Sequence, residues 1–330
     1  MSRPVLVICG VLLTLGVIAV PQKMAAAQSS SDRSAGASGW TVPRTPWGHP
    51  DLTGTFSSDD MRGVPLQRPE EYGSRRYLTD EEFAEREARN NAEVARLAAG
   101  GTAFLSERGV RSFRQTSLIV DPPNGRMPPL TPEGEAIRAA QRPRGDDAPP
   151  PASWLDLTLY DRCITRGVVG SVLPVIYGNG LEIYQTPDAV AIRYEMIHET
   201  RIIHLDGRPH VDDAVRSYMG DPVGYWDGDT LVVETTNFLG RTGIGLNGNG
   251  VPTTPAIRLT ERFTRVAEDQ IDYEVTMDDP GLYTAPFTIA MPLTTQPNYR
   301  VLPYECHEGN HALANILSAA RAEEAAAEGE

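Results

Sequence analysis

The sequence contains a single lysine, Lys23, among its 330 residues, and apart from six histidines every other basic side chain is an arginine. Lysine forms Schiff bases with carbonyl substrates and with pyridoxal phosphate, and it contacts the nucleotide phosphates in a P-loop. Lys23 lies in a segment that we expect to be cleaved off. These three chemistries are therefore excluded from the mature protein.

Positive charge as a whole is scarce. Lysine and arginine together number 30 against 44 aspartates and glutamates, which gives a formal net charge of −14. A nucleic-acid-binding protein needs a basic face that displaces counterions from the phosphates. We therefore expect no nucleic-acid partner.

The N-terminus has the three parts of a cleaved secretory signal: Arg3, an apolar stretch over 5–20, and the small residues 25–27. The apolar stretch, about 16 residues, is shorter than the roughly 20 that a spanning helix needs. We therefore expect a periplasmic or extracellular protein with no stable membrane anchor. Cleavage after residue 27 leaves 28 basic against 44 acidic residues, a net charge of −16.

Cysteine is rare as well, and the mature chain keeps only Cys163 and Cys306. An even pair in an oxidising compartment predicts a disulfide, with a catalytic cysteine as the alternative. In the chain-entropy model, a disulfide that closes the loop between residues 163 and 306 stabilises the folded state by on the order of 5 kcal/mol.

Four regions follow the signal in our interpretation. Residues 28–43 form a flexible leader, 44–160 a helical and loop wrap with one strand, 161–318 a β-barrel domain, and 319–330 a frayed tail. Within the wrap, Thr79 and Glu82 form a capping box that begins a helix, and Gly100 ends it. A shorter helix begins at Thr131, and Leu313, Ile316 and Leu317 predict a C-terminal helix.

The barrel prediction rests on short segments with period-2 alternation separated by turn residues, which are typical of antiparallel sheet. We predict strands near residues 50–56, 181–186, 189–198, 200–205, 230–237, 257–266, 270–278 and 286–291. Eight strands are enough to close a barrel, and closure removes exposed sheet edges.

The alternation places Glu261 on the core-facing side of its strand, between Leu259 and Phe263. A buried carboxylate needs a partner or has a raised pKa, and a raised pKa suits a general acid or base. The alternative is a structural pair with an arginine.

The strand predicted over 189–198 carries Tyr194 and His198 on one apolar face. His198 is therefore a second candidate for acid–base chemistry, although a satisfied core histidine is the alternative. Nearby, Arg201 and Arg208 could bind a carboxylate or another oxyanion through both guanidinium nitrogens, or could simply offset local acids.

His307, Glu308 and His311 match the zinc motif H-E-x-x-H, which needs both histidines on one helix face. Gly309 weakens a helix there, and the expected disulfide at Cys306 constrains it further. We therefore predict no metal site; His198, His204 and His210 do not form one either, because Asp206-Gly207 turns the chain between them.

Several segments together resemble a large family of secreted bacterial proteins of unknown function. They are residues 50–56, 117–126, 130–134, 162–163, 195–198, 205–210, 228–238 and 306–310, and the similarity extends from about residue 44 to 318. Phe56 departs from the family's tryptophan and His311 from its usual tyrosine, which counts against zinc. The resemblance implies a shared site at His198, Arg201, Asp206, Arg208, His210, Asn237, Glu261, His307 and Glu308. The first strand and the hairpin meander also resemble lipocalins, so the expected class is mainly β: an antiparallel, lipocalin-like (calycin-type) barrel with a few peripheral helices and a C-terminal helix.

The combined expectation is an exported barrel that binds a small organic molecule, with an anion as one option, and without a cofactor. It could be a metal-independent hydrolase, lyase or isomerase that uses His198, Glu261 and His307 as acid–base groups. Arg201, Arg208, Tyr194 and Asn237 would then bind substrate. The alternatives are a non-catalytic ligand-binding or structural envelope protein and, third, a zinc hydrolase. The sequence does not indicate an oligomeric state.

Overall fold

The computed structural model of the protein describes residues 40–100, 109, 111–142, 148–295, 299–302 and 304–328. The predicted signal and all but the last residues of the predicted leader lie outside these ranges. The described residues belong to one compact unit.

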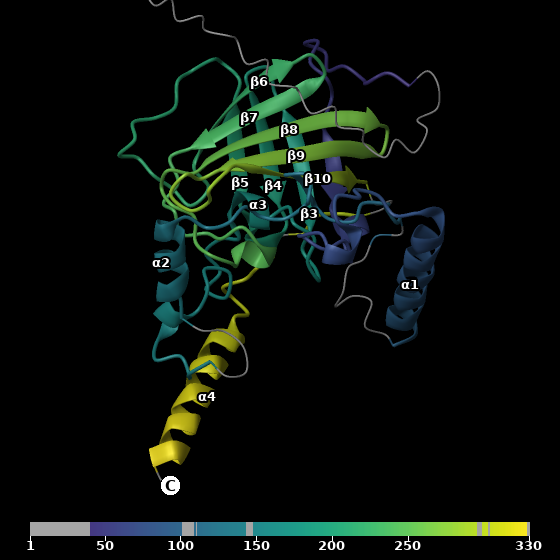
Figure 1. The fold of residues 1–330 in the computed structure, drawn as a ribbon. Coiled ribbons are helices and arrows are strands. Elements are labelled where there is room, and N and C mark those ends of the chain that lie inside the picture. The colour runs from purple at the N-terminus through teal and green to yellow at the C-terminus, as the bar shows by residue number, and fades with distance from the viewer. Residues whose placement is uncertain are drawn as a thin grey trace, which may run out of the picture. The chain divides into compact units, whose positions relative to one another are not determined.

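Within the described ranges, nine strands close into a barrel (Figure 1). Their order around the barrel is β1 (Gly54–Ser57), β3 (Gly180–Gln185), β4 (Ala189–Tyr194), β5 (Thr200–His204), β6 (Asp221–Asp227), β7 (Thr230–Thr236), β8 (Arg258–Ala267), β9 (Gln270–Asp278) and β10 (Phe287–Thr294). Pairing of Ser57 with Thr294 closes the ring. A further short strand, β2 (Ile119–Asp121), pairs with β10 beside this closure. The architecture fits the lipocalin-like class of barrels.

The prediction of a wholly antiparallel sheet was wrong at one place, because β5 and β6 are parallel. A parallel pair requires the chain to return to the same end of the barrel, and residues 205–220 make this return. Strand β6 itself was not predicted. It contains Pro222 and Gly224, residue types that are depleted in strands, so its sequence has a weak strand signal.

The barrel interior is lined mainly by apolar side chains. In β8 and β9 the inward positions alternate as predicted, with Glu261 inside and the charged residues outside, where Arg262 lies opposite Glu274. The buried core includes Phe56, Leu181, Ile183, Ile192, Ile203, Leu231, Val233, Leu259, Phe263, Val275, Phe287 and Met291. These side chains pack against one another as the core of the barrel.

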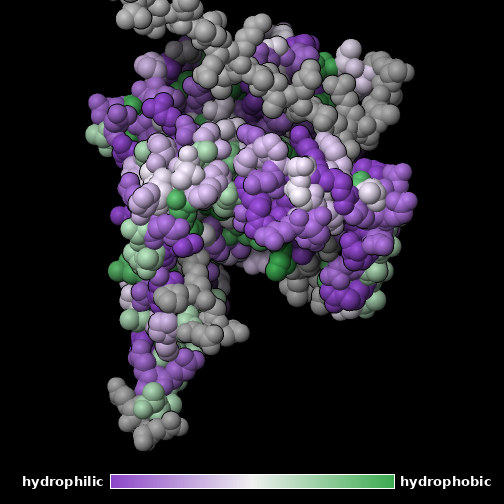
Figure 2. Space-filling model, viewed as in Figure 1, coloured by the Kyte–Doolittle hydropathy of each residue, from purple (hydrophilic) through white to green (hydrophobic). Residues whose placement is uncertain are grey.

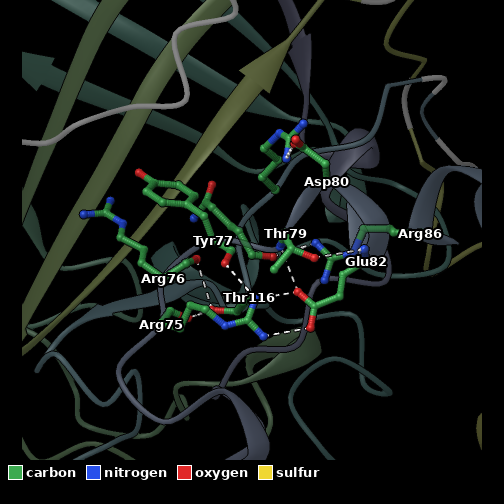
Figure 3. A network of polar contacts seen from close by, with 10 residues as sticks. Arg75, Arg76, Tyr77, Thr79, Asp80, Glu82, Arg86 and Thr116 are labelled. Carbon is green, nitrogen blue, oxygen red and sulfur yellow. Dashed lines mark hydrogen bonds and ion pairs between the residues drawn. The ribbon is translucent and has the colours of Figure 1, made fainter. Parts of the chain in front are cut away.

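Helix α1 (Asp80–Ala99) begins with the predicted capping box (Figure 3). The Thr79 hydroxyl accepts from the Glu82 amide at 3.3 Å, and the Glu82 carboxylate accepts from the Thr79 amide at 2.8 Å. Arg75 pairs with the same carboxylate. The hydrogen bonds from Arg75 and from the Thr79 amide together lower the pKa of Glu82 to about 2. Leu97 is the one residue of the helix that is buried, and the face of the helix visible in Figure 2 is mainly hydrophilic.

The segment that contains Phe113 and Gln115 links α1 to the barrel. Arg86 donates to the carbonyl oxygens of Phe113 (2.8 Å) and Gln115 (2.6 Å), while the Gln115 side chain donates to the carbonyl oxygen of Ala290 in β10 (2.9 Å). The helix is therefore attached through polar contacts, which agrees with its thin apolar stripe.

The remaining helices are α2 (Pro132–Ala140), which has proline at its first position as predicted, α3 (Gly167–Gly170) and α4 (His311–Glu328). Short 3₁₀ turns occur at Asp59–Met61, Glu70–Tyr72, Trp154–Asp156, Met196–His198 and Leu246–Gly248. Helix α4 continues to Glu328, through the residues for which we expected a frayed tail.

The predicted disulfide between Cys163 and Cys306 is confirmed, with the two Cα atoms 5.7 Å apart. Asn310 strengthens the same junction, because its side-chain amide donates to the carbonyl oxygen of Asp161 at 3.0 Å. The segment before α4 is therefore attached to the middle of the chain.

Candidate functional site

A buried ion pair crosses the interior of the barrel. Arg201 of β5 donates through both terminal nitrogens to the two carboxylate oxygens of Glu261 in β8, at 2.6 and 3.1 Å. The side chains are 1% and 0% exposed. This bidentate geometry is the strongest form of a guanidinium–carboxylate contact.

Three hydroxyl groups complete the network. Arg201 also donates to the hydroxyls of Tyr194 and Thr235, both at 3.1 Å, and the Tyr273 hydroxyl donates to Glu261 at 3.1 Å. The five side chains come from β4, β5, β7, β8 and β9, and all of them point inward. The network therefore ties together strands on several sides of the barrel.

Arg201, Tyr194 and Tyr273 keep their protons near neutral pH. Burial alone lowers the pKa of Arg201, but the attraction of Glu261 and Tyr194 outweighs burial and raises it. Burial raises the pKa of Tyr194 to about 12 and that of Tyr273 well above its ordinary value. Glu261 is thus the structural partner of an arginine, which was the alternative interpretation of its sequence position.

The buried tyrosines predict alkaline unfolding. Burial raises the pKa of Tyr194 and of Tyr283 to about 12, whereas an unfolded tyrosine ionises near 10. Between these values the unfolded state binds fewer protons, so the free energy of unfolding should fall by roughly 1.4 kcal/mol per pH unit for each tyrosine. Urea titrations from pH 8 to 12 measure this slope, and the near-absence of lysine from the sequence removes the usual competing titration.

Tyr283→Phe is the control for that slope, because the Tyr283 hydroxyl contacts only the Met127 sulfur, at 3.6 Å, among the described residues. The variant should lose about one tyrosine's share of the pH dependence. A slope that is flat to pH 12 in the original protein would contradict the prediction.

His198 does not lie where the sequence predicted. Strand β4 ends at Tyr194, and residues 196–198 form a 3₁₀ turn in which Ile197 and His198 have φ angles of 63° and 46°. This turn removes His198 from the apolar row and exposes it, with Nδ1 3.0 Å from the carbonyl oxygen of Tyr304. It makes no contact with Glu261, whose hydrogen bonds in the described structure come from Arg201 and Tyr273.

The other histidines are also dispersed. His307 is exposed in a turn and His311 is the first residue of α4, so the two do not share a helix face. His210 lies 3.0 Å from Asp221 through Nδ1, and His204 lies in β5. No group of three His, Cys, Asp or Glu side chains that could hold a metal occurs in the described part of the chain.

Arg208 and Asn237 have local partners. Arg208 binds Asp206 through Nε at 2.9 and 3.0 Å, and this hydrogen bonding holds the pKa of Asp206 at about 2. The Asn237 amide donates to the carbonyl oxygens of Val211, Asp212 and Val215, at 3.3, 3.0 and 3.0 Å. Asn237 therefore positions the 205–220 connection.

An open cleft of about 360 Å³ lies in the barrel wall where β5 separates from β6. The described strands pair at one position, His204 with Val223. The amide of Tyr194 donates to the carbonyl oxygen of Glu199, and the amide of Leu205 donates to the carbonyl oxygen of Asp188. The backbone N–H and C=O groups of odd-numbered residues in β5 therefore point toward β4. The backbone of Thr200 and Ile202 therefore faces the other side. The cleft is lined by Glu199, Thr200, Arg201, Ile202, Ser217, Tyr218, Met219, Gly220 and Pro222.

Glu199 is the carboxylate of this cleft. Its Oε2 accepts from the Thr165 hydroxyl at 2.7 Å, and the same hydroxyl lies 3.5 Å from the sulfur of Met219, which also lines the cleft. Burial raises the pKa of Glu199, with smaller opposing effects from Thr165 and Arg201. Of the residues expected to form the site, only Arg201 borders the cleft.

Most of these residues have no distinctive signal in the sequence, for a physical reason. Ser217, Tyr218 and Met219 lie in a connection without periodicity, and Glu199 lies at a turn. The one available signal was the position of Glu199 between His198 and Arg201, in a segment rich in titratable groups.

The fold and the cleft together define a lipocalin-like β-barrel with a small-molecule-sized opening in its wall. No family model, curated protein or solved structure matches the chain significantly. Across the described residues, no helix is long and apolar enough to cross a membrane.

Proposed function

We propose that the protein is an exported β-barrel that binds a small organic molecule in the cleft between β5 and β6. The main supporting observation is the cleft itself, whose volume of about 360 Å³ falls in the range of small-molecule sites. Its walls combine apolar side chains (Ile202, Met219, Pro222) with the Glu199 carboxylate and a few polar side chains. Binding sites usually have this composition.

Binding without catalysis is the form of this proposal that the contacts favour. Glu261 is neutralised by Arg201 and is inaccessible to solvent, while His198 and His307 are exposed and apart from it. An acid–base mechanism requires such groups to reach one substrate atom. The acid–base enzyme therefore stays the second candidate.

Export is supported by the Cys163–Cys306 disulfide, since disulfides persist in oxidising compartments. It accords with the secretory signal expected over residues 1–27. The periplasm or the extracellular space is the proposed location.

The proposal is tested by blocking the cleft. Ile202 borders the cleft and is 47% exposed, so Ile202→Trp should fill the opening without disturbing the core. Mass spectrometry of the natively purified protein, and thermal-shift screening of a fragment library, should detect ligands for the original protein that the variant does not bind.

Tyr225→Trp is the matched control, because Tyr225 is similarly exposed (50%) on β6 but does not line the cleft. It should retain binding. Ligands that bind equally well to all three proteins would place the site elsewhere and contradict the proposal.

A further inference from the structure

We propose that the cleft selects small organic cations, namely protonated amines with an apolar body, and that the Glu199 carboxylate binds the ammonium group. This inference rests on the proposed function and names the ligand class of the same cleft.

The first support is the incomplete coordination of Glu199. Its contact in the described structure is the Thr165 hydroxyl on Oε2, and no arginine or histidine lies within ion-pair distance of it there. A carboxylate can accept hydrogen bonds at both oxygens. Oε1 is therefore available to a ligand.

The second support is the local charge balance. Arg201, the nearest cation to Glu199 in the sequence, donates through both terminal nitrogens to Glu261. The Arg201 guanidinium is therefore occupied by Glu261, and no ion pair with Glu199 occurs among the described residues. The cleft therefore has an uncompensated negative charge at Glu199.

The third support is the cost of that charge. A carboxylate that is largely removed from water and lacks a cationic partner is destabilised, which is why burial raises the pKa of Glu199. An ammonium group at Oε1 would restore the missing charge partner. A carboxylate ligand would instead meet repulsion, because both arginines that were expected to bind anions already pair with acids, Arg201 with Glu261 and Arg208 with Asp206.

The walls of the cleft fit the remainder of such a ligand. Ile202, Met219 and Pro222 offer apolar surface, and Tyr218 adds an aromatic side chain. Exposed Ile202 and Thr200 belong to the strand edge that β6 leaves open. An alkyl or aryl amine would bury its apolar body against these residues.

The test compares three probes of nearly equal shape by calorimetry: benzylamine, benzyl alcohol and benzoate. Benzylamine should bind tightest and benzoate weakest. Glu199→Gln should weaken benzylamine binding roughly tenfold or more, the loss expected when a charged hydrogen bond is removed. It should change benzyl alcohol binding little. Glu274→Gln is the control, because Glu274 is a half-buried carboxylate with a raised pKa on β9, away from the cleft.

A pH series on the unaltered protein gives a readout that does not depend on the variant's folding. The groups that act on Glu199 are Thr165, Arg201 and Tyr194. None of these three changes charge below neutral pH, whereas Glu199 does. Benzylamine affinity should fall between pH 7 and pH 4 as Glu199 takes up a proton, while benzyl alcohol affinity stays constant.

The outcomes separate this inference from the proposed function. If the alcohol and the amine bind equally and Glu199→Gln changes neither, the cleft binds ligands but the amine selectivity is overturned. If none of the probes binds, the inference is overturned, while the fragment screen still decides the proposed cleft site. If binding persists in Ile202→Trp, both are contradicted.

Discussion

Replacing Glu261 with glutamine is expected to lower the free energy of unfolding by about 3–5 kcal/mol, because Arg201 would remain charged inside the barrel without a counter-ion. The amide keeps the shape of the carboxylate, so the loss would report charge rather than packing. Chemical denaturation followed by circular dichroism measures it.

The control is Glu234→Gln, which makes the same change at an exposed position on the neighbouring strand β7. It should alter stability by less than about 0.5 kcal/mol. The double variant Arg201→Met with Glu261→Met should recover part of the loss, since apolar replacement of a buried ion pair is often tolerated. A Glu261→Gln protein as stable as the original would show that the charge pair is not needed in the core.

Removal of the Cys163–Cys306 disulfide is expected to cost about 2–5 kcal/mol of unfolding free energy. The bond joins residues 143 apart in the sequence, and opening so long a loop increases the conformational entropy of the unfolded chain. The double substitution Cys163→Ala with Cys306→Ala, compared with the oxidised protein by denaturant titration, measures the difference.

A reducing agent provides the internal control for this experiment. It should destabilise the original protein to nearly the level of the double variant and leave the double variant unchanged. Mass spectrometry of the unreduced protein should also yield a linked peptide containing both cysteines. Equal stability of the original protein with and without reductant would contradict the prediction.

Much of the barrel could be predicted because its signals are local. The alternation of Leu259, Glu261 and Phe263 identified the inward face of β8, and the structure confirms it. The Thr79–Glu82 capping box placed the start of α1 to the residue. In both cases, neighbours in the sequence are also the neighbours that decide the conformation.

The parts that could not be predicted depend on distant residues. The turn that exposes His198 places its ring against the backbone of Tyr304, more than a hundred residues away. The parallel pairing of β5 and β6 depends on how residues 205–220 cross the end of the barrel. Asn237, which follows β7, stabilises this connection through its side-chain amide. No periodicity within β5 or β6 contains this information.

The sequence by itself determined the near-absence of lysine, the acidic charge, the pairing partners available to two cysteines and the inward position of Glu261, because each depends on composition or on local alternation. Only the tertiary structure decided that Glu261 pairs with Arg201 and that Glu199, which borders an open cleft, forms no ion pair with any described residue. The reason is that one guanidinium can bind one carboxylate in bidentate fashion, and which acid receives it depends on the folding of strands that lie far apart in the chain.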